Sequence, residues 1–202
     1  MTLASDLITR VRSVINESSS VTSPERTDAE ILQWIQDGQL DYVDRIPGEF
    51  FPELIEESTF SGASLSLTSD YFAFHACTVS YTMSGTYTGT TECFMERPGD
   101  TYMINNFPGY MGAYCYVKGD TIYAGPNVFS GTLSYIKKPT SLSTFSTTLE
   151  LHSEHENALV AYAAMKALQK TNDPLSSDLR QEYFEKILGK GGKAEAKEVK
   201  RA

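Results

Sequence analysis

The chain has 202 residues, of which 41% are hydrophobic and 21% are charged, and its formal net charge is -9. This apolar content excludes a fully disordered chain, and no apolar run reaches the roughly 18 residues that a membrane span requires. The first residues lack the basic and then apolar pattern of a secretory signal. The acidic balance argues against a general nucleic-acid binder, which would present a basic face.

The negative charge is unevenly distributed along the chain. Residues 1–57 carry -8 (4 basic, 12 acidic), residues 58–139 carry -1 (4 and 5) and residues 140–188 carry -3 (4 and 7). Residues 189–202 carry +3 (5 basic, 2 acidic). An acidic body therefore ends in a short basic tail, and this asymmetry indicates that the tail meets a partner that the body does not.

The segment 1–57 has the pattern of two helices. Apolar residues recur every three or four positions over residues 3–15, as they do on one face of a helix. Thr27 and Glu30 then form a capping-box motif, and a second apolar stripe follows over residues 31–46. We expect these two helices to form an antiparallel hairpin.

The segment 58–139 changes to short β-branched and aromatic runs that alternate with polar residues. Gly, Pro, Asn and Asp separate the runs, which is typical of antiparallel strands and hairpins. Strands are expected at 72–81, 87–95, 114–117, 121–124 and 131–136. Lys118-Gly119-Asp120 is the predicted turn of one hairpin, and Pro139 ends the last strand.

The segment 140–188 returns to a helical pattern. An alanine-rich helix is predicted over residues 158–168, and Ser176 or Ser177 is the expected cap of a final helix that Gly189 stops. The predicted fold class is therefore α+β. We expect a helical bundle built from both chain ends, with an inserted antiparallel β subdomain at 58–139.

Two groups of residues resemble a metal or catalytic site, but both are better interpreted as solvated surface. His152, Glu154, His155 and Glu156 lack the HExxH spacing, so a solvated acidic first turn is the better interpretation. The carboxylates that follow the first hairpin are interpreted as solvated surface; they are Glu49, Glu53, Glu56 and Glu57. No nucleophile motif occurs, so the sequence predicts no enzyme, no cofactor and no metal.

The three cysteines, Cys77, Cys93 and Cys115, are an odd number at wide spacing, and no CxxC occurs. This arrangement favours buried free thiols, kept reduced in the cytosol, over a disulfide framework or a zinc site.

Several segments resemble head-to-tail adaptor (connector) proteins of tailed bacteriophages. Residues 27–41, TDAEILQWIQDGQLD, are similar to the second helix of that family, often D-x-E-I-x-x-W-I-N-x-A-Q, with Gln36 and Gly38 as departures. The run from Lys118 to Pro139 resembles the family's closing hairpin and its exit. Two further matches are residues 149–164, which are similar to the long C-terminal helix, and Phe184, which matches the aromatic of the last helix. The similarity covers 27–188 without a good match in 60–112.

The resemblance implies a virion structural protein without enzyme activity. Such adaptors assemble as a ring, usually of twelve copies, between the portal protein and downstream neck or tail proteins. They are made in the host cytoplasm, lie in the virion neck and line the DNA exit channel without specific DNA binding. An acidic lumen would repel the passing phosphate backbone.

Two surfaces are expected to bind these partners. In several such adaptors a C-terminal extension docks on the portal, and here the basic residues of 189–202 occupy that position: Lys190, Lys193, Lys197, Lys200 and Arg201. Three tail glycines disfavour a continued helix, so we expect the free tail to be disordered. The loop 97–112 carries apolar side chains that we assign to a tail or neck protein: Tyr102, Phe107, Tyr110 and Met111.

Besides an enzyme, which the absence of an acid–base or nucleophile constellation disfavours, two other function classes stay open. One is a different tail or neck component, such as a tail-completion protein. The other is a β-rich carbohydrate- or receptor-binding module, which 12 Tyr and 10 Phe would suit. An exposed aromatic platform in a concave cleft would favour the second.

Overall fold

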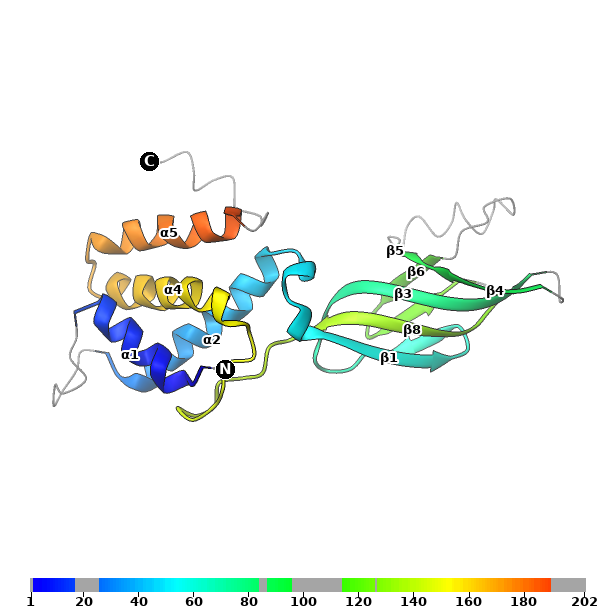
Figure 1. Cartoon of the computed structure of the whole chain (residues 1–202), viewed down its shortest axis with the longest axis horizontal. Helices are drawn as coiled ribbons and strands as arrows, with labels where there is room; N and C mark the ends of the chain where they lie inside the picture. The colour runs from blue at the N-terminus through cyan, green and yellow to red at the C-terminus, as the bar shows by residue number, and fades with distance from the viewer. Residues whose placement is uncertain (1, 17–25, 84–86, 96–113, 126, 190–202) are drawn as a thin grey trace. The chain divides into compact units, whose positions relative to one another are not determined.

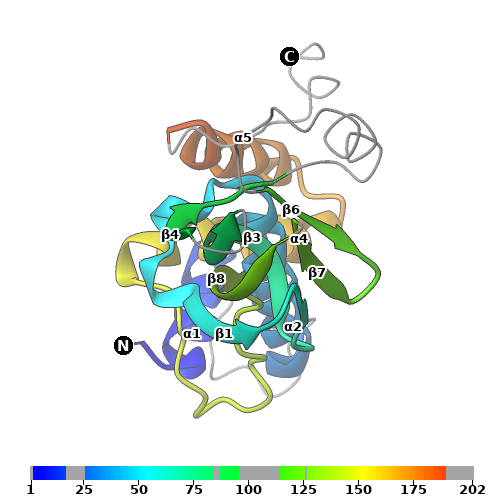
Figure 2. The ribbon, with the colours of Figure 1, turned by 90° about the vertical axis from the view of Figure 1, so that its right-hand side faces the viewer.

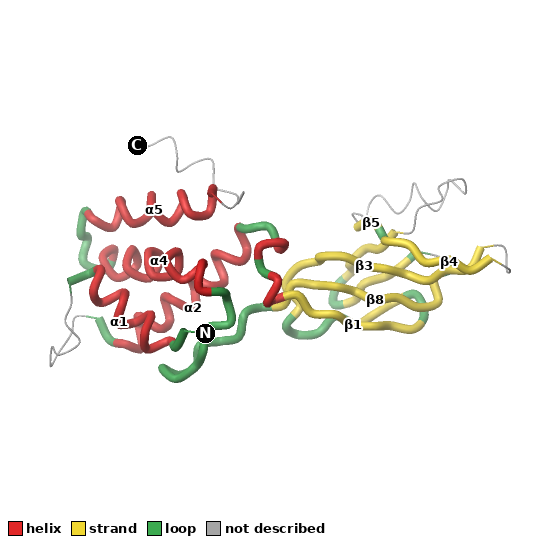
Figure 3. The backbone as a smooth tube through the Cα atoms, viewed as in Figure 1, coloured by secondary structure: helices red, strands yellow, loops and turns green. Residues whose placement is uncertain are grey.

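The computed structural model describes residues 2–16, 26–83, 87–95, 114–125 and 127–189. The chain divides into two compact units, one formed by Met1–Leu54 with Pro139–Ala202 and the other by Ile55–Lys138. The named helices lie in the first unit and the named strands in the second (Figure 3). The prediction of an α+β protein with helices and antiparallel sheets is thus confirmed.

In its described residues, the helical unit contains four α-helices that come from both ends of the chain (Figure 1). They are α1 (Ala4–Val14), α2 (Asp28–Arg45), α4 (Glu156–Gln169) and α5 (Leu175–Gly189). Helix α4 packs against each of the other three. Its many alanines are almost fully buried, and such small side chains let neighbouring helices approach closely. The core of this unit is therefore arranged around α4.

Helix α2 begins where the sequence predicts it. The Thr27 side chain accepts a hydrogen bond from the Glu30 backbone N–H, and the Glu30 carboxylate accepts one from the Thr27 N–H at 2.9 Å. These two bonds satisfy donors that the first helical turn leaves without a partner. The predicted capping box is confirmed.

Helix α5 starts differently from the prediction. It begins at Leu175, whose N–H donates to the Asp173 carboxylate at 2.9 Å. Ser176 and Ser177 lie inside the first turn, so the prediction that one of them caps the helix is wrong. Pro174 precedes the helix, and its fixed φ suits that position.

The described part of the other unit contains eight strands in two four-stranded sheets. The strands are β1 (Ile55–Ser61), β2 (Ser64–Ser66), β3 (Tyr71–Met83), β4 (Tyr87–Glu92), β5 (Phe94–Met95), β6 (Tyr114–Lys118), β7 (Thr121–Ala124) and β8 (Val128–Lys137). The first sheet has the order β1-β8-β3-β4 (Figure 2). The second sheet has the order β2-β7-β6-β5. All pairs are antiparallel except the two-residue pair of β5 and β6.

Buried residues of both sheets form one hydrophobic core. Cys77, Val79 and Leu133 come from the first sheet, and Cys115 and Ile122 come from the second. The alternation of side chains along each strand directs these residues to one face. The predicted turn at Gly119 also forms, with a positive φ of 61° that glycine adopts without strain.

Irregular pairing in β3 changes which side chains enter this core. The sequence alternation assigns His75 to the face of Cys77 and Val79, but the register with β8 shifts between Phe74 and Ala76. Phe74 consequently packs against the core, and His75 is exposed. A one-residue shift of this kind reverses the faces of the residues before it.

Candidate functional site

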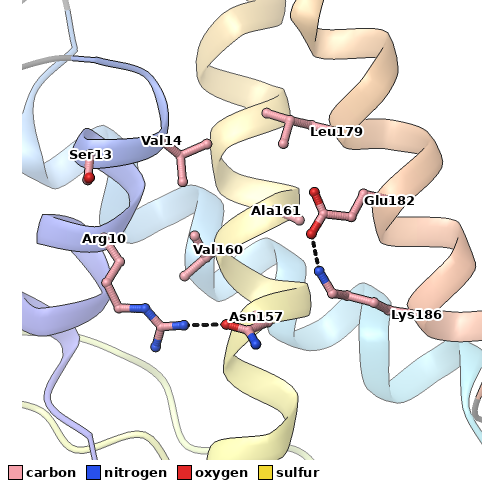
Figure 4. A pocket seen from close by; sticks show the side chains of 9 residues that line it. All are labelled: Arg10, Ser13, Val14, Asn157, Val160, Ala161, Leu179, Glu182 and Lys186. Atoms are coloured by element: carbon pink, nitrogen blue, oxygen red, sulfur yellow. Dashed lines mark hydrogen bonds and ion pairs between the residues drawn. The ribbon is translucent and has the colours of Figure 1, made fainter.

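A groove runs between helices α1, α4 and α5 of the helical unit (Figure 4). Its volume is about 470 Å³, and three residues of each helix line it. The lining residues are Arg10, Ser13, Val14, Asn157, Val160, Ala161, Leu179, Glu182 and Lys186. The lining contains no histidine or cysteine, and Lys186 is engaged by Glu182, so the groove has the chemistry of a binding surface.

The floor of the groove is apolar and fixed by packing. Val160, Ala161 and Leu179 are all buried. Val160 and Ala161 lie three and four residues after Asn157, so all three are on one side of α4, and α4 contacts both α1 and α5. The floor is therefore a preformed apolar surface.

The rim of the groove carries both signs of charge. Arg10 donates to the Asn157 amide oxygen and to the Glu156 carboxylate, each at 2.5 Å. Lys186 forms an ion pair with Glu182 one turn away on α5 (Figure 4). The partly exposed pair of Lys186 and Glu182 contributes little to stability, which leaves both groups available for exchange with the charges of a partner. An apolar floor with a mixed polar rim suits a segment of another protein chain.

A second hollow lies between α2 and the segment 141–145. It has a volume of about 490 Å³, and the Gln36 side chain accepts a 2.6 Å hydrogen bond from the Leu142 N–H at its edge. The Phe145 side chain lines the hollow and is 47% exposed. This hollow also offers apolar contact without reactive groups.

The prediction of a solvated turn before α4 holds for His152 and Glu154, which are exposed, but it is wrong for His155 and Glu156. His155 is fully buried, with its Nδ1 3.3 Å from the Tyr42 hydroxyl, and its ring packs on Phe51. Glu156 is also buried and receives hydrogen bonds from Arg10 and Thr2. These contacts are between segments distant in sequence, which local spacing does not reveal.

Burial also raises the pKa values of two tyrosine hydroxyls in this core, those of Tyr42 and Tyr183. Loss of solvent raises the pKa of Tyr42 to about 12, and the nearby Glu154 charge adds to this effect. Burial also raises the pKa of Tyr183, whose hydroxyl donates to the Asp41 carboxylate at 2.7 Å. Both phenols stay protonated at neutral pH and act as structural hydrogen-bonding groups.

The residues that the sequence assigned to partners lie outside the described residues. This holds for the basic tail residues Lys190, Lys193, Lys197, Lys200 and Arg201 and for the loop residues Tyr102, Phe107, Tyr110 and Met111. The groove was not predicted, because it needs three helices whose packing is not encoded in local periodicity. A signal was nevertheless present, since Ala161 belongs to the alanine-rich stretch of α4.

The three cysteines are brought together in the β unit. All three are buried, as predicted, and their Sγ atoms lie within 4.8 Å of one another. In the described parts of the chain, this is the group of residues with the spacing of metal ligands.

Comparison with known proteins and protein families identifies the family of the chain. No curated protein matches it, and in the described regions no helix combines the length and apolar character needed to cross a bilayer. The model of the SU10 adaptor protein family matches residues 1–200. This match confirms the resemblance to phage head-to-tail adaptors, a class of structural proteins and not of enzymes, and the chain belongs to the SU10 adaptor protein family.

Proposed function

We propose that this protein is a head-to-tail adaptor of a tailed-phage virion. It forms a closed ring, with twelve copies the expected number, between the portal protein and a downstream neck or tail protein. The observation that carries this proposal is the family match over residues 1–200. The separation of a helical unit from a β unit supports it, because a bridging protein needs distinct surfaces for distinct partners.

The charge of the chain supports a channel-lining role. Without its tail the protein carries -12, since the full chain carries -9 and residues 189–202 carry +3. An acidic lumen repels phosphates, so DNA passes without specific binding. The helices from both chain ends act as one bundle in this proposal, with the β unit inserted between them.

Subunits of a ring meet through two different faces, which must be complementary. We assign the α1-α4-α5 groove to one of these faces, because its preformed apolar floor and charged rim fit a neighbouring chain. The basic tail is assigned to the portal, and the loop 97–112 to the neck or tail protein. The hollow lined by Tyr71 and Tyr135 does not support a carbohydrate-binding module, because it leaves no volume for a water-sized molecule.

The test of the proposed function combines the purified protein with the portal of the same virus. Native mass spectrometry and electron microscopy should show a ring on the portal, and the free protein is expected to be monomeric because heterologous interfaces often close only on a template. A portal from an unrelated virus is the control. Failure to bind the cognate portal or any neck protein would contradict the proposal.

The role of the groove has a separate test. Ser13 is exposed on the groove rim, so Ser13→Trp should leave the fold intact and fill the groove. We expect this variant to bind portal without closing a ring. Gln181→Trp is the matched control, since Gln181 is exposed on α5 and does not line the groove. Normal rings from Ser13→Trp would show that the subunit interface lies elsewhere.

A further inference from the structure

Three cysteines from separate strands meet in the core of the β unit. Cys77 lies in β3 of the first sheet and Cys115 in β6 of the second. Cys93 lies between β4 and β5, where the chain passes from the first sheet to the second. Its N–H donates to the Cys77 carbonyl at 2.8 Å, which fixes these two residues opposite each other. The cluster therefore joins both sheets.

The sulfur atoms converge at one point of this core. All three Sγ atoms lie within 4.8 Å of one another. The residues are 2%, 8% and 0% exposed for Cys77, Cys93 and Cys115. The described residues that share the core cluster are mainly apolar, including Val79, Ile122 and Leu133. A group of three thiols enclosed in this way is either simple packing or a ligand set.

We propose that Cys77, Cys93 and Cys115 form a three-thiolate site for a thiophilic divalent metal ion of the Zn²⁺ class. Zinc–sulfur bonds are about 2.3 Å long, so three sulfurs around one ion stand about 4 Å apart. Contraction of the cluster by less than about 1 Å reaches this geometry. Soft thiolate ligands select such ions over Mg²⁺ or Ca²⁺, which prefer oxygen.

Because the site is buried among apolar residues, it should favour a divalent over a monovalent ion. On binding, three metal–sulfur bonds form and the thiol protons leave to solvent, with no change in oxidation state. Three thiolates with a divalent ion carry a net charge of -1, whereas a monovalent ion would leave -2. Burying charge is costly, so the divalent ion is favoured in this apolar core.

Metal binding at this site should release protons. Because only the deprotonated form of cysteine is a metal ligand, the affinity for the ion should increase with pH.

A bound ion would strengthen a weak part of the β unit. Strand β5 pairs with β6 through only two residue pairs, Phe94 with Tyr114 and Met95 with Cys115. An ion held by Cys77, Cys93 and Cys115 connects β3, the β4–β5 junction and β6 directly. Because the ion binds only the folded arrangement tightly, it stabilises that arrangement by mass action.

The test uses the full-length protein, kept reduced and treated with a chelator. Titration with Co²⁺ should produce sulfur-to-metal charge-transfer absorption with saturation at one ion per chain. Zn²⁺ should displace Co²⁺ and raise the Tm of the β unit by several degrees. The variants Cys77→Ala, Cys93→Ala and Cys115→Ala should each lose the absorption and weaken Zn²⁺ binding by at least tenfold. His75→Ala, on the exposed side of β3, is the matched control and should bind normally.

Several results would overturn the proposal, and the first two are measured on the wild-type protein, so they do not depend on the variants folding. Wild-type protein with three titratable thiols that binds neither Co²⁺ nor Zn²⁺ below micromolar concentration would show that the cysteines only fill the core. A disulfide among them in freshly purified protein would exclude the site as well. Binding that survives all three substitutions would place the ion elsewhere. The experiment requires no portal, so its failure is distinct from failure of the adaptor proposal.

Discussion

At the scale of single residues, Arg26 holds together two helices that are distant in sequence. It is 5% exposed, and its Nε donates to the Ala167 carbonyl at 2.8 Å near the end of α4. Its Nη2 donates to the Thr171 hydroxyl at 2.7 Å. The Arg26 carbonyl in turn accepts a hydrogen bond from Arg12, which is also buried. Two buried guanidinium groups thus link the start of α2 to α1 and α4.

We expect Arg26→Met to lower the free energy of unfolding of the helical unit by about 2–4 kcal/mol. The variant loses the charge-assisted hydrogen bonds to Ala167 and Thr171 and leaves the buried Ala167 carbonyl without this donor. Burial of the Met side chain only partly offsets this loss. Chemical denaturation followed by fluorescence of Trp34, the single tryptophan, reports on this unit. Lys186→Met is the control and should change stability by less than about 1 kcal/mol, because its pair with Glu182 is largely exposed. Equal losses of stability in Arg26→Met and Lys186→Met would contradict a structural role of the buried Arg26 side chain.

At the scale of secondary-structure elements, an ion pair joins the first turn of α2 to the end of α4. The Lys170 ammonium contacts the Glu30 carboxylate at 2.7 Å. This hydrogen bond, followed by the one from the Thr27 N–H, lowers the pKa of Glu30 to about 2. A carboxyl whose pKa falls on folding stabilises the protein above its unfolded value of 4.5, and this contribution is lost as the pH falls from 4.5 toward 2.

Lys170→Met should therefore raise the pKa of Glu30. The value should stay below 4.5, because the capping box with Thr27 remains. NMR titration of the Glu30 carboxyl measures the shift directly. Lys166→Met is the control on the same helix, since Lys166 lies over the Tyr162 ring and should not affect Glu30. An unchanged Glu30 pKa in Lys170→Met would show that the capping box alone causes the depression.

The elements also show what the sequence could and could not predict. Helix periodicity, the Thr27 capping box and the Gly119 turn are local patterns, and the structure confirms them. Gly38 lowers the helix propensity of residues 28–45. A Cβ at this position would, however, lie 2.7 Å from the Tyr162 ring. The close approach of α2 to α4 thus explains this glycine, and only tertiary packing reveals it.

Non-local contacts account for most of what was missed. An arginine such as Arg26 is usually exposed, so no pattern indicated that it is buried. The three cysteines are far apart in sequence, and they converge only because β3 and β6 belong to facing layers of one core. The groove likewise depends on how α1 and α5 pack on α4.

At the scale of the whole molecule, the β unit is an insertion whose ends meet. Ile55 of β1 is paired with Ile136 of β8, and directly paired residues of antiparallel strands lie about 5 Å apart. The chain therefore leaves the helical unit after Leu54 and returns at Pro139 from neighbouring positions.

This arrangement predicts that the helical unit folds without the insertion. In the variant, residues 55–138 are replaced by a short Gly-Ser linker between Leu54 and Pro139, and such a loop closes at small entropic cost. Circular dichroism should show a helical protein that unfolds cooperatively, and Trp34 should remain half-buried. A molten or aggregated product would mean that the helices need the β unit to fold.

The last prediction concerns the basic tail, and it rests on the proposed contact with the portal. Residues 189–202 contain five basic and two acidic residues on a chain that is otherwise strongly acidic. A contact made through these charges must weaken as salt screens them. Deletion of residues 190–202, which leaves α5 whole, should reduce portal affinity at least tenfold at low salt and remove most of its salt dependence.

A variant with all five basic tail residues changed to Gln keeps the length of the tail but removes its positive charges. It therefore distinguishes the contribution of charge to portal binding from that of other contacts made by the tail. If charge carries the contact, this variant should behave like the deletion. If ordering of the chain contributes further contacts, it should retain intermediate affinity, because a segment that folds on binding gains from more than its charges. Portal binding measured at low and high salt distinguishes these cases. A truncated protein that binds as tightly as the full chain, with the same salt dependence, would show that the tail is not the docking element and that the portal contact lies on the acidic body.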